Sequence, residues 1–483
     1  DSAHIVTFAT IKAKQAIRDA ARVLGLPFSS GDRVAKLMPP MILGNTATIS
    51  ECLSLDEENT SGYSKEFYSA SEELRKQYKN DEEAKQIIDI ALGLEGLRRQ
   101  DGIHAAAIVI SPDTITKFLP IQQKGSNAEI VTQYEMHTVE QLGLLKMDFL
   151  GLRNLSIVDR TLELIGSESL DIDNLKLDDE KTFKLFAEGK MTGVFQLESR
   201  VAQSTSRSLK PKRFEDIVAL VALIRPGPLG AGMHNEFADR ANNRKEIEYL
   251  HSDLESILNE TYGVILYQEQ VMQIAEKIAG FNLQEADNLR VAMGKKIPKV
   301  MEEQRKKFTD GAVSNNYSEQ FAIELFDQIA YFAGYGFNKS HSVPYALLAY
   351  QTAYLKANYP AEYIAACLTA VKRDKDRTAI FLSEARDMGV KVSTPDVNLS
   401  SSDFTVNDNE ILFGLSAVRN VGDITADKIV LERESNGDFK SIEEFLSRID
   451  SRSLNKRGVE ALIQGGGLCL LYTSPSPRDC KTS

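Results

Sequence analysis

The stretch from Gly143 to Gly151 constrains the fold of this chain most, because it joins a strand pattern directly to a helix pattern. Side chains alternate between the two faces of a strand, so Lys146 and Asp148 share one face. The opposite face carries three apolar residues, Leu145, Met147 and Phe149. Apolar residues recur at helical spacing after Gly151. We therefore expect a buried strand over residues 143–149 that leads into a helix.

Asp148 comes near the C-terminal end of this predicted strand, where folds of sheets and helices usually build their sites. A carboxylate and an ammonium group on one face suit a hard metal ion and a phosphate. The same two residues also fit a cap of the following helix and a solvated lysine. The stretch by itself leaves both interpretations open.

Length and composition bound the class of protein. A chain of 483 residues exceeds one hydrophobic core, so we expect about two to four domains. No apolar run approaches the roughly 20 residues of a membrane span. The four cysteines fit neither a zinc site nor a disulfide framework, which suits the cytoplasm. The net charge of −12 argues against a uniformly basic nucleic-acid surface but allows a local basic cleft.

The N-terminal region carries two further patterns. Residues 6–24 predict a helix capped by Thr10, on which Arg18 and Arg22 lie one turn apart. They fit either a solvated basic face or a contact with nucleic-acid phosphates. Residues 102–110 predict a second buried strand, in which His104 fits a structural role as well as a ligand role.

Residues 152–398 are predominantly helical in pattern, and two segments stand out. Residues 290–307 form the most basic window of the chain. Residues 332–342 combine glycines and aromatics with Lys339, Ser340 and His341. Backbone amides of such a loop can hold phosphates, and its aromatics can stack on a base. A capped loop before a core helix is the alternative.

The pattern changes again from residue 396. Residues 403–406 and 411–414 predict a strand pair with a turn between them. Residues 418–423 resemble a helix-hairpin-helix element, whose amides contact a DNA phosphate without reading sequence; an ordinary helical hairpin is the alternative. Residues 469–479 resemble the translation of a sequencing-library adapter, so we exclude this tail from the fold.

Many segments together resemble the alpha subunits of bacterial DNA polymerase III, the C-family of replicative polymerases. The resemblance runs from Thr7 to about Gly465. The segments that carry it are Thr7-Phe8, Ala16 to Asp19, Lys146 to Arg153, Phe195 to Arg200, Arg225 to Leu229, Tyr262 to Gln273, Ala292 to Lys296 and Gly334 to Ser342.

The resemblance implies a mostly helical α+β fold. It comprises part of a polymerase-β-like nucleotidyltransferase palm, an inserted helical thumb, large helical fingers and a helix-hairpin-helix region. The implied domains are residues 1–25 as partial palm, 26–103 as thumb, 104–153 as continued palm with the metal-ligand strand, 154–395 as fingers, 396–465 as the helix-hairpin-helix DNA-binding region and 466–483 as a non-native tail.

The family's reaction is template-directed transfer of a deoxynucleotide to a primer 3′-hydroxyl by two-metal catalysis, in chromosomal replication. Three palm aspartates of the family hold two Mg²⁺ ions, and Asp148 matches one of them. The other two belong to a Pro-Asp-x-Asp segment that should precede residue 1, so we expect a fragment. Lys146 would face the primer end or the nucleotide phosphates. We expect the fragment alone to be inactive, because one carboxylate cannot hold two metals.

The resemblance also implies binding residues and partners. The nucleotide site would include Arg290, Lys295, Lys296, Asn338, Lys339, Ser340 and His341. The DNA contacts would include Arg18, Arg22, Val421 and Gly422. The partners would be primer-template DNA, deoxynucleoside triphosphates and, through regions outside this chain, a sliding clamp and other replisome subunits, in the cytoplasm and without a membrane.

Three departures from the family pattern keep alternatives open. Ala106-Ala107 stand where relatives usually carry Gly-Gly, Val201-Ala202 stand in place of Gly-Met, and Val291 replaces a second arginine after Arg290. The chain could thus be a non-catalytic DNA-binding relative of the polymerase, and a degenerate upstream Pro-Asp-x-Asp segment would favour that. A primase-like nucleotidyltransferase is a third hypothesis, which predicts products without a primer.

Overall fold

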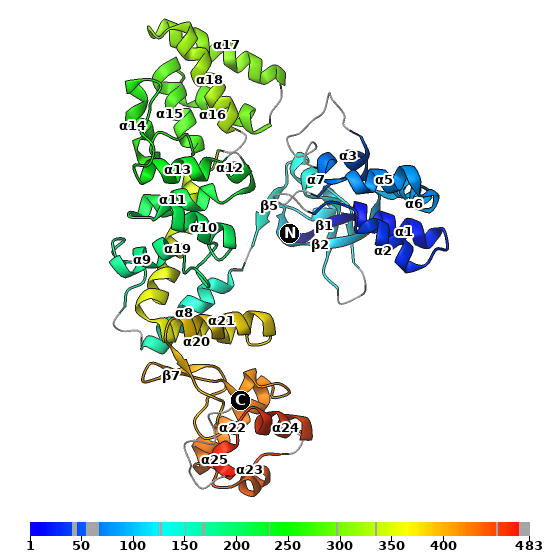
Figure 1. The fold of residues 1–483 in the computed structure, drawn as a ribbon, viewed down its shortest axis with the longest axis vertical. Helices are drawn as coiled ribbons and strands as arrows, with labels where there is room; N and C mark the ends of the chain where they lie inside the picture. Colours follow the sequence, from blue (N-terminus) through cyan, green and yellow to red (C-terminus); the bar gives the residue numbers. More distant parts are fainter. Residues whose placement is uncertain are drawn as a thin grey trace. The chain divides into compact units, whose positions relative to one another are not determined.

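A computed structural model describes residues 1–40, 46–54, 67–123, 125, 128–149, 151–166, 170–230, 232–295, 298–333, 336–450 and 453–472. The chain forms two compact units, Asp1–Gly151 and Leu152–Ser483, whose elements are labelled in Figure 1. Helices predominate over two small sheets, which confirms the predicted mostly helical α+β class. Within these described ranges, every helix is too short or too polar to cross a membrane.

The first unit contains a five-stranded sheet in the order β3-β4-β1-β2-β5. Its strands are β1 (Ser2–Thr10), β2 (Arg98–Ile110), β3 (Ile121–Gln122), β4 (Val131–Glu135) and β5 (Leu145–Asp148). β1 is central, runs antiparallel to β2 and parallel to β4, and β5 lies at an edge. Near α7 (Met136–Gln141) and the 3-10 helix η1 (Ile115–Lys117) a small core forms from Ala3, Ile5, Ala107, Val109, Ile115, Leu119, Val139 and Leu144.

The predicted helix over residues 6–24 is wrong in its first turns. Residues up to Thr10 belong to β1, and α1 (Ala13–Val23) begins only after Lys12. β1 lies between two partner strands with Ile5 and Val6 buried. Backbone pairing on both sides outweighs the helical spacing of its apolar residues, a tertiary effect that local pattern does not contain.

Helices form a separate cluster in the first unit. They are α1, α2 (Phe28–Ala35), α3 (Ile49–Leu53), α5 (Glu72–Asn80) and α6 (Glu82–Leu94). The apolar stripe of α1, including Ile17, packs with Val34 and Ile88 in one core. This amphipathic stripe is what the helical periodicity of α1 predicts.

The second unit begins with a long succession of helices. They are α8 (Arg153–Ile165), α9 (Glu180–Glu188), α10 (Arg200–Leu209), α11 (Phe214–Leu223), α12 (Pro226–Gly230), α13 (Met233–Ala241), α14 (Glu255–Leu258), α15 (Gln268–Ala279), α16 (Leu283–Lys295), α17 (Pro298–Ser314), α18 (Glu319–Ala333), α19 (Lys339–Asn358), α20 (Pro360–Val371) and α21 (Lys375–Asp387). α19 is buried against α9 and α11 along much of its length, with Tyr350 fully buried. The Ser342 hydroxyl donates to the Val218 carbonyl at 2.7 Å, which fixes the start of α19 on α11.

The chain then forms a small sheet and a last helical cluster. β6 (Lys391–Val392), β8 (Glu410–Leu412) and β7 (Thr405–Asn407) make a sheet in that order. The predicted β7–β8 hairpin is confirmed, and Asp408 and Asn409 take positive φ values of 49° and 61° in its turn. The cluster contains α22 (Asp423–Asn436), α23 (Ile442–Arg448), α24 (Lys456–Gln464) and α25 (Cys469–Tyr472).

The C-terminal cluster has its own apolar core, which includes Phe439, Phe445, Leu462 and Leu468. Residues 473–483 of the predicted non-native tail lie outside the described residues. The predicted domain boundaries within each unit stay predictions.

Candidate functional site

The predicted metal ligand Asp148 ends the edge strand β5. Lys146 Nζ lies 2.7 Å from Asp148 Oδ2, so the two side chains share a face as the strand alternation predicts. The Asp148 side chain is 52% exposed and that of Lys146 is 16% exposed. The hydrogen bond to Asp148 raises the pKa of Lys146. The carboxylate is therefore open to solvent and neutralised by one lysine, with which a bound cation would have to compete.

The prediction that residues 143–149 form a buried strand is wrong. Among the residues that the structure describes, β5 pairs with β2 alone, which places it at an edge of the sheet. Leu145 is 58% exposed and Phe149 is 61% exposed. Apolar composition marks a face that packs somewhere in a fold, but it does not distinguish a central strand from an edge strand.

His104 has a structural role through one ring nitrogen. The register between β1 and β2 shifts between His4 and Val6, so four residues of β2 lie opposite Ile5 alone. His104 Nδ1 accepts hydrogen bonds from the amides of Ala106 and Ala107, at 3.2 and 2.9 Å. This satisfies amides that the bulge frees and leaves the proton on Nε2.

Both arginines predicted to bind DNA from α1 have acidic partners inside the first unit. Arg18 binds Asp32 through Nε and Nη2, at 3.1 and 2.8 Å. Arg22 Nη2 lies 2.6 Å from Asp19 and remains 72% exposed. A phosphate bound at either arginine would share that arginine with an aspartate. Arg22 is the more accessible of the two arginines.

The described residues offer no ready-made metal cluster. Within these ranges, no three His, Cys, Asp or Glu side chains gather in a way that could hold an ion. Asp148, with its exposed carboxylate, fits one monodentate ligand of a hard cation.

In the second unit, the start of α19 brings together the predicted nucleotide residues 338–341. Asn338 caps α19 by accepting a hydrogen bond from the His341 amide at 2.8 Å. Lys339 Nζ lies 2.6 Å from the Glu260 carboxylate, with the side chains 36% and 30% exposed. Ser340 is exposed. The cap is what the sequence suggests for a loop before a helix, whereas the Glu260 partner was not predicted.

Two neighbours complete this helix start. The Glu269 carboxylate accepts the Lys339 amide at 2.9 Å, so an acidic side chain already occupies one free donor. The His341 ring lies 4.2 Å from the Tyr345 ring and 5.6 Å edge-on from Phe337, measured between centroids. His341 is therefore held in an aromatic group at the surface.

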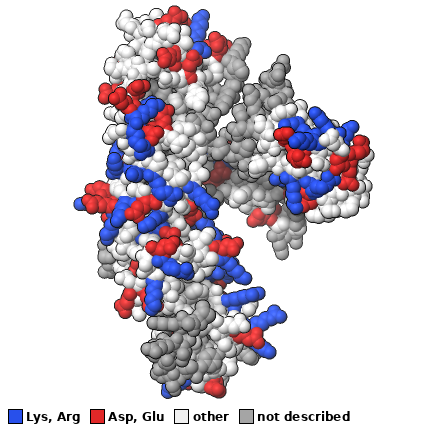
Figure 2. Space-filling model, viewed as in Figure 1, with Lys and Arg blue, Asp and Glu red and all other residues white. Residues whose placement is uncertain are grey.

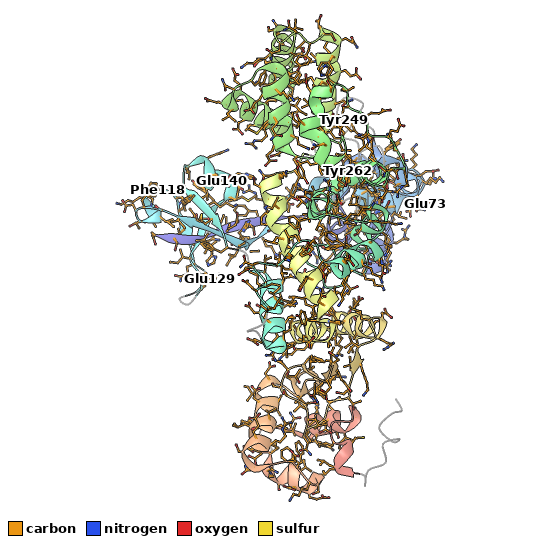
Figure 3. All side chains as sticks on the ribbon, turned by 90° about the vertical axis from the view of Figure 1, so that its left-hand side faces the viewer. Glu73, Phe118, Glu129, Glu140, Tyr249 and Tyr262 are labelled. Atoms are coloured by element: carbon orange, nitrogen blue, oxygen red, sulfur yellow. The ribbon has the colours of Figure 1, made fainter. Side chains whose placement is uncertain are left out.

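Sequence reasoning missed a partly buried network beside Lys339, in which Asp216 is the buried member. Arg213 Nε lies 3.1 Å from Asp216, and its Nη2 donates to the Glu260 carbonyl at 2.7 Å. Tyr262, labelled in Figure 3, donates its hydroxyl to Asp216 at 2.9 Å. Burial and the Asp216 carboxylate raise the pKa of Tyr262 to about 12, so the phenol stays protonated and remains a donor at neutral pH. The network positions Glu260, and the residues are too scattered in sequence to form a motif.

The basic window predicted to hold the triphosphate is described only in part. Arg290 lies on α16 and pairs with Asp287 at 2.8 Å. Lys295 ends α16, but its side chain is outside the described part of the structure, as is all of Lys296.

The predicted DNA-binding hairpin precedes α22. The Val421 amide already donates to the Val418 carbonyl at 3.0 Å, whereas Gly422 is the N-cap of α22 and is exposed. Asp423 pairs with Lys372 and Arg373, each at 2.5 Å. These two cations neutralise an aspartate that would otherwise repel a phosphate at this hairpin.

Basic and acidic side chains alternate over the face of the molecule in Figure 2. They do not segregate into one basic surface on that face, in line with the net charge of −12. On that face, a contact with nucleic acid would therefore depend on local clusters of cations.

Family models match most of the chain. The model described as "Bacterial DNA polymerase III alpha NTPase domain" matches residues 1–151. That described as "Bacterial DNA polymerase III alpha subunit finger domain" matches residues 154–316. A "Helix-hairpin-helix motif" model matches residues 389–473.

Curated relatives match nearly all of this chain but only part of their own length. The "DNA polymerase III subunit alpha" of Thermus aquaticus is 44% identical over 475 residues, which are 96% of this chain and 37% of the relative. The protein of the same name from Escherichia coli K12 is 43% identical over 96% of this chain and 39% of the relative. That from Mycobacterium tuberculosis H37Rv is 41% identical, with 96% and 39% covered. The chain thus spans about two fifths of the length of these relatives.

Proposed function

We propose, from the premise that this chain belongs to the family of bacterial DNA polymerase III alpha subunits, that it is the part of a replicative DNA polymerase that adds deoxynucleotides to a primer 3′ end. The observation that supports this most is the exposed Asp148 carboxylate, placed at the end of a strand and paired with Lys146. Its substrates would be primer-template DNA and deoxynucleoside triphosphates.

Asp148 would bind one of two Mg²⁺ ions, which, when bound, lower the pKa of the primer hydroxyl and neutralise the triphosphate. The described residues supply this single carboxylate rather than a cluster of three ligands. Lys146, whose pKa is raised, would stay charged and turn from Asp148 to a phosphate oxygen. We therefore expect no primer extension by this chain alone, and robust extension would contradict the single-ligand account.

Lys339 would hold a triphosphate oxygen, with Ser340 and His341 beside it. Lys339 is partly exposed, and its ammonium group pairs with Glu260. An incoming triphosphate would displace the Glu260 carboxylate from it, because a multiply charged phosphate attracts an ammonium group more strongly than one carboxylate does. Asn338 would act indirectly, by capping the helix that carries these residues.

A chimeric enzyme tests the proposal. Residues 1–465 of this chain would replace the matching segment of the Escherichia coli relative, which is 43% identical over the match. We expect primer extension by the chimera, and Asp148→Asn should lower its rate at least about 100-fold, because metal-ion stabilisation of the transition state contributes several kcal/mol. Affinity for primer-template DNA, measured by fluorescence anisotropy, should stay within about twofold.

The matched control is Asp159→Asn, which changes an exposed aspartate on α8 and should leave extension unchanged. A loss of DNA affinity parallel to the loss of activity in Asp148→Asn would assign a structural role to Asp148. A chimera that binds DNA without extending it would favour the non-catalytic relative, and extension without a primer would favour a primase-like enzyme.

A further inference from the structure

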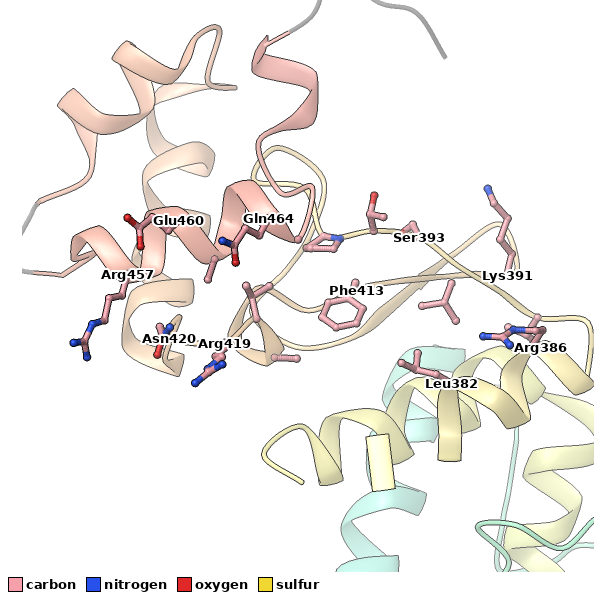
Figure 4. A pocket seen from close by; sticks show the side chains of 18 residues that line it. Leu382, Arg386, Lys391, Ser393, Phe413, Arg419, Asn420, Arg457, Glu460 and Gln464 are labelled. Carbon is pink, nitrogen blue, oxygen red and sulfur yellow. The ribbon is translucent and has the colours of Figure 1, made fainter. Parts of the chain in front are cut away.

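A cleft of about 830 Å³ lies inside the second unit, between the end of α21 with β6 and the C-terminal helical cluster. Figure 4 shows it from close by, with Arg386 and Lys391 toward one end, Arg419 and Arg457 toward the other, and Phe413 between them. The cleft has the size of a small-molecule or short-polymer site. The predicted DNA contacts use only the hairpin beside it.

Three arginines line this cleft with their charges unneutralised. Arg386 comes from the last turn of α21, Arg419 from the hairpin and Arg457 from the first turn of α24. All three are exposed, and none makes a side-chain hydrogen bond or ion pair within the described residues. Elsewhere in the chain most arginines described above bind a carboxylate. Three unpaired guanidinium groups around one cleft indicate a polyanionic ligand.

The remaining charges at the cleft do not cancel this excess. Lys391 pairs with Glu410 at 2.8 Å on the adjacent strand. Glu460 is the acidic residue among those lining the cleft, and it lies 3.8 Å from Lys456. Each of these acidic side chains has a lysine partner of its own, so the three arginines keep their net positive charge.

The floor of the cleft is apolar and contains one aromatic ring. Phe413 lies there with Leu382, Pro395 and Val418. Its ring is fixed edge-on to Phe404, with the centroids 4.8 Å apart. An aromatic floor between cationic ends suits single-stranded nucleic acid, whose bases stack on aromatic rings while its phosphates pair with cations. A duplex keeps its bases stacked inside and offers nothing to such a floor.

We infer that this cleft binds a short stretch of unpaired nucleic acid. Arg386 contacts a phosphate at one end, Arg419 and Arg457 contact phosphates at the other end, and a base lies against Phe413. This inference rests on the proposed function in one respect, the choice of nucleic acid over other polyanions. An acidic peptide has the charge but not the flat bases that the Phe413 floor accommodates.

The test uses the whole 483-residue chain and a short fluorescein-labelled oligothymidylate, followed by fluorescence anisotropy. We expect Arg386→Ala and Arg457→Ala each to weaken binding about three- to tenfold. Each should also reduce the slope of log affinity against log salt concentration by about 0.7, the value for one lost single-strand phosphate contact. The matched control is Lys375→Ala, at the opposite, exposed end of α21, which should change neither quantity.

The aromatic floor is tested with two variants, because Phe413 also packs on Phe404. Phe413→Leu keeps an apolar side chain and should still weaken binding about threefold or more, since stacking requires a flat ring. Phe413→Tyr keeps the ring and should restore affinity. An oligonucleotide containing 5-iododeoxyuridine, crosslinked by light and mapped by mass spectrometry, should attach at Phe413 or at residues lining the cleft.

Other outcomes would overturn the inference. Crosslinks elsewhere together with unchanged affinity in the arginine variants would exclude single-strand binding here, as would a glutamate-rich peptide that binds through the same arginines when oligothymidylate does not. A blunt DNA duplex separates this failure from failure of the proposed function. When the oligothymidylate results fail in one of these ways, normal binding of the duplex means that only the cleft inference fails, whereas binding of neither probe means that the proposed function fails with it.

Discussion

The two ends of helix α19 carry the same ion pair in different surroundings. At its start, Lys339 Nζ lies 2.6 Å from Glu260, with side chains 36% and 30% exposed. Near its end, Lys356 Nζ lies 2.6 Å from Glu384, with side chains 1% and 14% exposed. The distances are equal, so the distance does not distinguish the roles of the two lysines.

The other contacts of each lysine do distinguish them. Lys356 also donates to the carbonyls of Lys190 and Thr192, at 2.7 and 2.8 Å, so its three donors are satisfied away from water. Lys339 has Glu260 and, 5.5 Å away, the face of the Tyr267 ring. Lys356 therefore fastens the 190–192 loop to α19 and α21, whereas Lys339 can exchange its carboxylate for another anion.

Replacing Lys356 should have the largest effect. Lys356→Ala should lower the free energy of unfolding by about 3–5 kcal/mol, because Glu384 and two carbonyls lose their partner in a buried site. Urea denaturation of the whole chain measures it. The control is the double variant Lys356→Met with Glu384→Leu, which should recover the part of the loss that comes from the unpaired Glu384 carboxylate but not the part from the two carbonyls. A double variant as unstable as the single one would show that side-chain shape matters here rather than charge.

The pH dependence of stability sharpens the same contrast. Burial lowers the pKa of Lys356 in the folded protein, so in the window between that pKa and the ordinary value of about 10.4 the unfolded state binds more protons. The free energy of unfolding of the unmodified chain, minus that of Lys356→Met, should therefore rise with pH through this window. The rise should be at most about 1.4 kcal/mol per pH unit. Urea titrations at stepped pH give this difference. If the difference in free energy of unfolding between the two proteins stays constant or falls as the pH rises, Lys356 is not desolvated.

Replacing Lys339 should instead affect ligand binding. Lys339→Ala should change the free energy of unfolding by less than about 1 kcal/mol, because exposed ion pairs contribute little. Affinity for a deoxynucleoside triphosphate with magnesium should fall about tenfold, as a charged hydrogen bond is lost. Isothermal calorimetry measures the affinity, and Lys181→Ala on α9 is the exposed control. A stability loss as large as that of Lys356→Ala would remove the contrast between the two ends.

The smallest effect is expected on the partner of Lys339. Glu260→Gln removes the carboxylate that a triphosphate would have to displace, so nucleotide affinity should rise about threefold, an effect the size of one exposed ion pair. The Arg213 bond to the Glu260 carbonyl is preserved in this variant. Reduced affinity, measured by the same calorimetry, would show that Glu260 helps nucleotide binding instead of competing with it.

Several local features could be predicted because they depend on neighbours in sequence. The β7–β8 hairpin follows from the alternating pattern and turn residues around Asp408, and the Lys146–Asp148 pairing follows from strand alternation. The strand β1 was missed because its conformation depends on β2 and β4, which lie about a hundred residues away. The exposure of β5 was missed for the same reason, since an edge is a property of the whole sheet.

The amino-acid sequence by itself determined the family, the predominance of helices and the residue types available at residues 146–148 and 338–341, because these depend on residue identity and short-range spacing. Only the tertiary structure decided which lysine of α19 is buried away from water. It also decided that Arg213, Asp216 and Tyr262 position Glu260 beside Lys339. Only the tertiary structure showed that Arg386, Arg419 and Arg457 share one cleft. Burial and charge pairing join residues that are distant along the chain, and no local pattern records those distances.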